Sequence, residues 1–307
     1  MIRISKQTND GWPIHKIVAN ATIYSPAGEL LSSFRHHPQP GQISDALTNI
    51  ERNYQALAAE PRYKHFVRIP ERILRCIDYF GVGCNRAKAK ARLHSYYLFI
   101  GVVDNAIDSG NVDTGERILQ YLSAPGSFRE EILSSSLRLV TEILRGHISA
   151  VSSSSMIERF RELYQTVISE REAESIEAYI EHRRAVGRLT ATLSYELISP
   201  LLERETRSLL RFMNQVGEVG CLVDSVIDLD ADRRIGLLRF QPNMIDRARL
   251  IVCTLQAGLR VLLRHPGLCG LFLQAITDNV RDRFRGQQTQ DLVHIVASRK
   301  DEPAIVA

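Results

Sequence analysis

Apolar residues recur at intervals of three and four along almost the whole chain after residue 43, which is the periodicity of an α-helix with one buried face. Turn residues such as Ser109-Gly110 and His265-Pro266-Gly267 separate the periodic segments, and strand-like alternation does not occur among them. We therefore expect an all-α fold in the form of a single large helical bundle. The predicted helices span about 44–60, 70–80, 85–108, 128–148, 156–172, 175–198, 204–230, 244–264 and 268–285.

The first forty or so residues have a different pattern. An apolar run at 17–24 is followed by the turn-like Ser25-Pro26-Ala27-Gly28, which predicts either a short hairpin or a partly disordered leader. We divide the chain into a short non-helical N-terminal arm at 1–42, a helical domain at 43–300 and a tail at 301–307.

The composition narrows the class of protein. Of the 307 residues, 44% are hydrophobic and 24% are charged, as in ordinary globular proteins. The net charge of +4 is mild and the basic residues are dispersed, so no nucleic-acid partner is expected. The charge suits a small polyanion or an anionic membrane surface equally well, and a peripheral membrane contact therefore stays open, as does a homodimer.

Cysteine usage and the absence of long apolar runs predict the compartment. The five cysteines form no CxxC pair, which indicates neither a disulfide framework nor a zinc site and favours a reducing compartment. The first residues lack an apolar signal core, and no run reaches the roughly 18 apolar residues of a membrane span. We expect a cytoplasmic protein.

Two predicted helices carry carboxylates on one face. An apolar run at 96–103 leads into Asp104 and Asp108, and a second apolar segment contains Asp224, Asp228 and Asp232 at i, i+4 and i+8. Like charges at this spacing repel, and hard cations such as Mg²⁺ relieve the repulsion through oxygen ligands. A single DxxxD usually marks a solvated helix face. Two of them on apolar helices favour a shared magnesium cluster.

The predicted helix between these two carries basic residues. Tyr179, Arg183 and Gly187 share one face of it, and the glycine either bends the helix or permits close packing. Arg183 is placed to direct a planar guanidinium at phosphate oxygens. The structural alternative is an exposed basic helix whose arginines pair with Glu177 and Glu181.

At these residues the chain resembles the class I isoprenoid synthases, and most closely the squalene/phytoene synthase group, over roughly 70–284. The segment 104–108 resembles the first aspartate motif, 179–187 the intervening tyrosine-and-glycine helix, and 224–228 the second motif. The run 233–242, RRIGLLRFQP, resembles the basic segment of the family that ends in proline. The resemblance implies the isoprenoid synthase type of helical bundle.

The chain also departs from this group. Head-to-head synthases usually place glutamine, asparagine and arginine before the second motif, at positions that correspond here to Gly217, Gly220 and Val223. The departure disfavours condensation of two prenyl substrates. The three-aspartate spacing also resembles the asparagine/serine/glutamate triad of terpene cyclases, in which an upstream arginine, here Arg183 or Arg184, senses the diphosphate. A divergent bacterial-type terpene synthase is thus a second match.

The resemblance implies a Mg²⁺-dependent terpene synthase or prenyltransferase that ionises an allylic prenyl diphosphate. Coupling or cyclisation would follow, with release of pyrophosphate. It implies three Mg²⁺ ions held by the aspartates of both motifs. The residues around the prenyl chain would be Tyr179, Tyr195 and the apolar and aromatic residues that precede Asp104. The arginines that it implies as phosphate ligands are Arg183, Arg184, Arg188, Arg233 and Arg234.

Other classes of protein were weighed on the same residues. A noncatalytic helical binding or scaffold protein, with solvated acidic faces, remains the alternative. A di-iron bundle is disfavoured because the chain has no Glu-x-x-His motif, and a serine hydrolase because it has no GxSxG elbow. Substrate chain length, the number of substrates and the shape of the product depend on pocket depth, which residue spacing does not specify.

Overall fold

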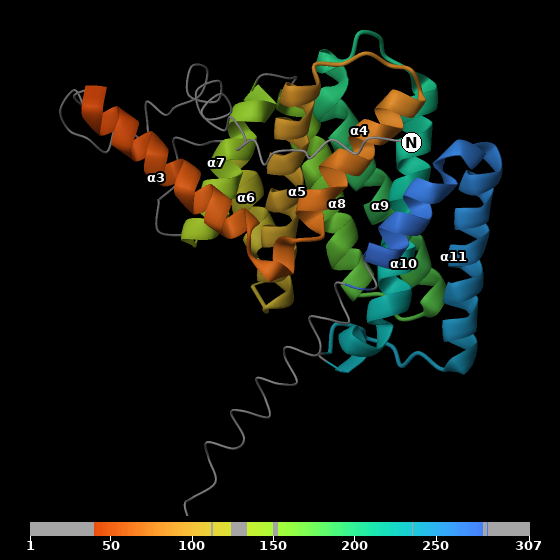
Figure 1. Ribbon diagram of the computed structural model, residues 1–307. Coiled ribbons are helices and arrows are strands. Elements are labelled where there is room, and N and C mark those ends of the chain that lie inside the picture. Colours follow the sequence, from red (N-terminus) through yellow and green to blue (C-terminus); the bar gives the residue numbers. More distant parts are fainter. Residues whose placement is uncertain are drawn as a thin grey trace, which may run out of the picture.

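The computed structural model describes residues 40–111, 113–123, 134–149, 153–234, 236–278 and 281. Within these ranges nearly all regular structure is helical, and the β-type pairing is limited to one isolated antiparallel bridge between Cys84 and Leu202 (Figure 1). The predicted all-α fold is confirmed. None of the helices in these ranges combines the length and the apolar character that a membrane crossing requires.

The helices have well-defined bounds, and residues 269–278 are helical as well. The α-helices are α3 (Pro40–Ala58), α4 (Ile69–Tyr79), α5 (Arg86–Asp108), α6 (Thr114–Ser123), α7 (Ser135–Ser149), α8 (Ser153–Arg171), α9 (Ile176–Ile198), α10 (Arg207–Arg234) and α11 (Met244–Arg264).

Most predicted helices agree with these bounds, and three differences are informative. The periodicity did not predict α6, because a segment of ten residues is too short for its apolar spacing to stand out. The helix predicted at 204–230 runs on to Arg234, which places Asp232 on the helix. Helix α3 begins at Pro40, slightly before the predicted domain boundary, while the predicted hairpin lies outside the described residues.

Local capping explains why α5, which carries the first aspartates, and α9, which carries Arg183, begin where they do. The Asn85 side chain accepts a hydrogen bond from the backbone N–H of Lys88 (3.2 Å) at the start of α5. Ser175 caps α9 in the same way through the N–H of Ala178 (3.3 Å). These short polar side chains satisfy N–H groups that have no partner within the helix, and so they set the register of the residues downstream.

The closest helix pair is α9 with α10, and two glycines permit it. A Cβ on Gly187 would collide with the backbone of Gly217, and a Cβ on Gly217 would collide with the backbone carbonyl of Gly187. Of the two roles predicted for Gly187, close packing is therefore the one observed. Because of this contact, Arg183, one turn earlier on α9, lies directly against α10.

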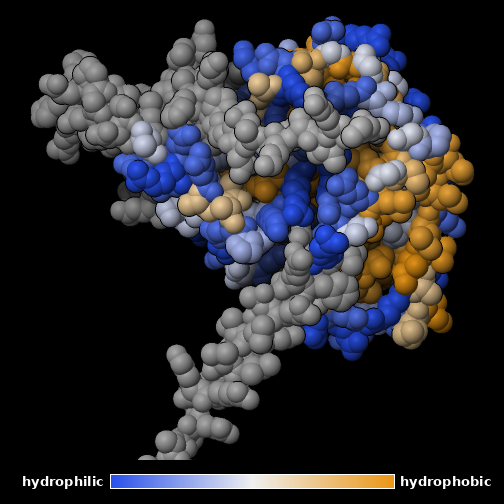
Figure 2. All heavy atoms as spheres, in the orientation of Figure 1, coloured by the Kyte–Doolittle hydropathy of each residue, from blue (hydrophilic) through white to orange (hydrophobic). Residues whose placement is uncertain are grey.

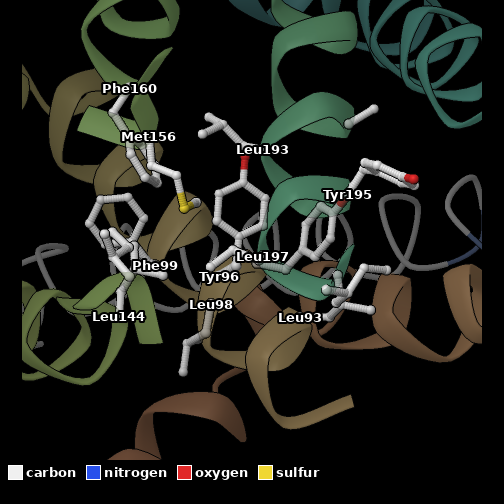
Figure 3. Packing of buried hydrophobic residues seen from close by; sticks show 14 of the residues in the cluster. Leu93, Tyr96, Leu98, Phe99, Leu144, Met156, Phe160, Leu193, Tyr195 and Leu197 are labelled. Carbon is white, nitrogen blue, oxygen red and sulfur yellow. The ribbon is translucent and has the colours of Figure 1, made fainter. Parts of the chain in front are cut away.

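The main core lies between α5, α7, α8 and α9. Figure 3 shows Tyr96 and Leu98 of α5 packed among Met156 of α8, Leu144 of α7 and Leu193 of α9. All five side chains are almost completely buried. A second, smaller cluster joins α9, α10 and α11 through residues such as Ile180, Leu222 and Leu250.

Candidate active site

The C-terminal end of α5 carries two of the predicted site residues. Asp104 and Asp108 are both exposed to solvent, one turn apart on the same side of the helix. Asp108 forms an ion pair with Arg171 at the end of α8. Arg171 also donates to the backbone carbonyl of Ile107 (3.4 Å), so its guanidinium holds the last turn of α5 against α8.

Arg183 of α9 joins three helices in the same region. Its Nε donates to Ser225 Oγ of α10 (2.8 Å), and one terminal nitrogen donates to Glu170 Oε1 of α8 (3.2 Å). The other terminal nitrogen donates to the backbone carbonyl of Cys221 (3.2 Å). The Arg183 side chain is only 20% exposed and Glu170 only 14%. This mostly buried guanidinium is held in one orientation.

The second acidic helix faces the first. Asp224, Asp228 and Asp232 are half-buried and follow one another at four-residue intervals along α10. Burial raises the pKa of Asp104, and the charges of Asp108 and Asp224 raise it further. The charge of Asp108 likewise contributes to the raised pKa of Asp232, after burial. The structure thus brings Asp104 and Asp108 of α5 close to Asp224 and Asp232 of α10.

Burial and mutual repulsion raise the pKa of two carboxylates in the acidic cluster. Burial raises the pKa of Asp104 to about 7, repulsion from Asp108 adds to the rise, and attraction from Arg183 only partly offsets it. Burial also raises the pKa of Asp232 to about 6, again against an opposing effect of Arg183. Asp104 is nevertheless accessible to solvent. This combination is expected of a carboxylate that protein surrounds on most sides while water still reaches it.

The chemistry of these residues bears on whether Mg²⁺ fits. The coupled carboxylates include those of Asp104, Asp108, Asp224 and Asp232, and their oxygens are ligands of the type that a divalent cation prefers. Among the described residues, however, no three His, Cys, Asp or Glu side chains lie close enough to hold an ion alone. The residues fit magnesium that also binds substrate oxygens and water.

Two of the predicted phosphate-binding arginines lie elsewhere. Arg184 and Arg188 line a pocket of about 400 Å³ between α9 and α11, together with Glu181 and Arg249. Arg188 also pairs with Glu218 of α10 (3.0 Å). Because adjacent residues on a helix are about 100° apart, Arg184 points away from the aspartates that its neighbour Arg183 approaches. The structure does not bring this pair into the acidic cluster.

The other predicted substrate-binding residues lie near the end of α10. Arg233 and Arg234 are exposed in its last turn, and Arg234 Nε donates to the backbone carbonyl of Asp230 (3.2 Å). Tyr179 is buried, and its ring centroid lies 5.9 Å from that of Phe240. The connection after α10 therefore folds back onto the tyrosine of α9, which places the run 233–242 at the edge of the cluster.

The aromatic residues proposed to surround a prenyl chain are packed in the core. Tyr96 donates a hydrogen bond to the carbonyl of Thr190 (3.1 Å), and the hydroxyl of Tyr97 accepts one from Ser194 (2.9 Å). The hydroxyl of Tyr195 accepts a hydrogen bond from the N–H of Thr206 (3.2 Å). Their buried polar groups are paired, so packing alone accounts for these residues.

Sequence reasoning missed Glu170 and Arg171, the residues through which α8 enters the cluster. Helix α8 also carries Glu158, Glu162 and Arg161. No spacing or motif in the sequence distinguishes Glu170 and Arg171 from these three residues. The distinguishing feature is position, because the C-terminal end of α8 lies against that of α5 only in the folded chain.

Comparison with known proteins identifies no relative of this chain, so the site is described from its geometry alone. No family model matches the chain, and neither a curated protein nor a solved structure matches it.

Proposed function

We propose that the acidic cluster binds the diphosphate group of an allylic prenyl diphosphate, which the protein ionises in a Mg²⁺-dependent reaction of the class I isoprenoid synthase type. Prenyl coupling or cyclisation then follows, with release of pyrophosphate. The observation that carries the proposal is the approach of the aspartates of α5 to those of α10, where burial and mutual repulsion raise the pKa of Asp104 and Asp232. Carboxylates held together against their repulsion are suited to bind cations rather than to stabilise the fold.

The proposed magnesium ligands are the carboxylates of both acidic helices: Asp104, Asp108, Asp224, Asp228 and Asp232. When bound, magnesium neutralises diphosphate charge and so stabilises the departing pyrophosphate. The resemblance in sequence implies three ions.

The two arginines in the cluster have different tasks. Arg183 is mostly buried and bonded on all sides, so it supplies a fixed positive charge and orients α10 relative to α8. Arg171 lies at the rim, where its partner Asp108 is 42% exposed. A diphosphate competes with Asp108 for Arg171, and this exchange gives the phosphate oxygens a charged hydrogen-bond donor.

Residues that flank the aspartates protect a carbocation from nucleophiles. Ile107 is buried beside Asp108, and Val103 is half-buried beside Asp104. Burial raises the pKa of the Cys221 thiol to about 12, so this nearby sulfur stays protonated and is a poor trap for an allylic cation. Exclusion of water serves the same purpose, since water would quench the cation to an alcohol.

The first prediction is that pyrophosphate release requires one aspartate from each helix. The full chain is assayed with geranyl, farnesyl and geranylgeranyl diphosphates and Mg²⁺, and extracted products are analysed by mass spectrometry. Asp104→Asn and Asp224→Asn should each lower kcat/KM by about a hundredfold or more. Asp230→Asn is the matched control, because Asp230 lies on α10 outside the acidic stripe and is paired with Arg247 (2.7 Å).

Equal losses in all three variants would contradict the proposal. If folded wild-type protein neither turns over these substrates nor binds Mg²⁺ with inorganic pyrophosphate in calorimetry, the noncatalytic alternative replaces it. The identity of the product distinguishes coupling from cyclisation.

A further inference from the structure

Helix α11 is hydrophobic on both sides, although only one side packs against other residues that the structure describes. Leu250 and Val261 are buried against the bundle. The opposite side exposes Met244 (78%) and Leu263 (75%), and further large apolar side chains lie between them. These are Ile245, Ile251, Val252, Leu255 and Leu259. Figure 2 shows the result as a hydrophobic band along the side of the molecule where α11 lies in Figure 1.

The outer side of α11 repeats every seven residues. Two rows of apolar residues, three positions apart, form the a and d positions of a heptad pattern, which is the spacing by which one helix packs along another. The rows are Ile245, Val252 and Leu259, and Ala248, Leu255 and Leu262. No charged residue interrupts either row. A lipid surface would bind an apolar face without any seven-residue register, so the pattern favours a helix as the partner.

The register is complementary to itself when two copies of α11 run antiparallel. Position a of one helix then faces position d of the other, and a single alignment pairs all six residues: Ile245 with Leu262, Ala248 with Leu259, and Val252 with Leu255. The small Ala248 meets a large leucine, as an interdigitated seam requires. An antiparallel pair is also what a twofold axis across the helix generates.

The residues on either side of the a and d rows, at heptad positions e and g, agree with the antiparallel orientation. Antiparallel helices place g positions beside g positions, and here these are the uncharged Met244, Ile251 and Gly258. They place e positions beside e positions, where Arg249 of one copy meets the neutral Gln256 of the other. A parallel pair would instead set Arg249 beside the apolar g side. Arg249 forms an ion pair with Glu177 of its own chain, and the antiparallel arrangement keeps this pair beside a neutral residue.

The exposed area is close to the lower limit for a specific interface. A fully buried aliphatic side chain corresponds to about 60–120 Å² of apolar surface. Most of the exposed α11 side chains retain about half or more of their surface, so the helix presents several hundred Å² per copy. Two copies then approach the lower range of specific protein interfaces, about 1,200 Å² in total, and Leu273 of the following helical segment extends the patch.

We propose that the outer face of α11 binds the same face of a second copy of this chain in an antiparallel, twofold-symmetric dimer. The proposal does not depend on the proposed function, because it rests on α11 alone. The experiment is sedimentation equilibrium of the full chain across concentration, with Leu255→Glu as the disrupting variant. Ala56→Glu, an exposed position on α3, is the matched control.

Wild type and Ala56→Glu should sediment as dimers, at twice the 34.7 kDa of the chain. Leu255→Glu should weaken dimerisation by about a hundredfold or more, because the charge enters the seam twice. Circular dichroism checks the fold of each variant, and Leu255→Gln offers a milder disruption if the charged variant unfolds.

Three results would overturn the proposal. One is wild-type protein that remains monomeric up to about 100 µM. Another is a dimer that persists equally in both Leu255 variants, which would place the interface elsewhere. The third is a monomer that binds phosphatidylglycerol vesicles through Leu255, which would assign the face to a lipid surface.

Discussion

The two halves of α5 differ in what they contribute to the protein. In the first half, Leu93 and Leu98 are completely buried, and the hydroxyl of Tyr96 is paired. In the second half, Asp104 and Asp108 face other carboxylates, and burial together with this repulsion raises the pKa of Asp104. One half of the helix stabilises the fold, and the other half is held by it in an unfavourable arrangement. Such local conflict is expected where residues are kept for binding or chemistry.

The two halves of α5 should also differ in how they make the stability of the protein depend on pH. His94 belongs to the packed half of α5, where its Nδ1 is 2.7 Å from the hydroxyl of Tyr54. His147 of α7 lies against the same half, with Nε2 3.3 Å from the hydroxyl of Ser95. Burial lowers the pKa of both histidines to about 4, and nearby cations add to the effect. Burial raises the pKa of Asp104 and Asp232, so the acidic half shifts the opposite way. The two regions should therefore respond to acid with opposite signs.

The largest expected change in stability comes from the packed half. Leu98→Ala removes a fully buried side chain from the centre of the core, and we expect the free energy of unfolding to fall by about 2–5 kcal/mol. Urea denaturation followed by circular dichroism measures it. Gln120→Ala is the control, because Gln120 is exposed on α6, outside both the core and the patch on α11. Similar losses in both variants would show that the region around Leu98 is not the main core.

The next effect is the loss of stability on acidification. Unfolded histidines bind a proton near pH 6.5, whereas His94 and His147 in the folded protein resist protonation until about pH 4. The contribution of these histidines to the free energy of unfolding is complete above pH 6.5. It is lost as the pH falls towards 4, by at most about 3 kcal/mol for each histidine. Replacing both with glutamine should flatten this part of the stability profile. A profile that stays equally steep would assign the acid sensitivity to other groups.

The smallest expected effect is a gain in stability when Asp104 is replaced. An unfolded aspartate loses its proton near pH 3.8, but Asp104 retains it until about pH 7, so its contribution to stability is present below pH 3.8 and lost as the pH rises through 7. Asp104→Asn should stabilise the metal-free protein at pH 8 by about 1 kcal/mol, a figure reduced for solvent screening of this exposed group. The gain should vanish at pH 4. Thermal unfolding at both pH values, without Mg²⁺, measures it, and destabilisation at pH 8 would contradict unfavourable burial and repulsion at the Asp104 carboxylate.

Features that depend on neighbouring residues in the chain were predictable. The 3.6-residue period of the helix puts Asp104 above Asp108 wherever the helix is placed. The short polar caps Asn85 and Ser175 begin α5 and α9 close to the predicted positions. The all-α fold follows from the same local pattern, because helical hydrogen bonds join residues only four apart.

Features that depend on the packing of distant segments were not predictable. The spacing of residues on α9 does not say which side of the helix meets α10, so Arg183 and Arg184 had equal claims to the site. The contact of Gly187 with Gly217 decides which side of α9 meets α10. It places Arg183 against α10 at Ser225, next to Asp224 in the chain. The position of Glu170 beside Arg183 and the exposure of the outer side of α11 also depend on how distant segments pack. Helical periodicity specifies which residues share a face, whereas packing between helices far apart in the chain decides what each face meets.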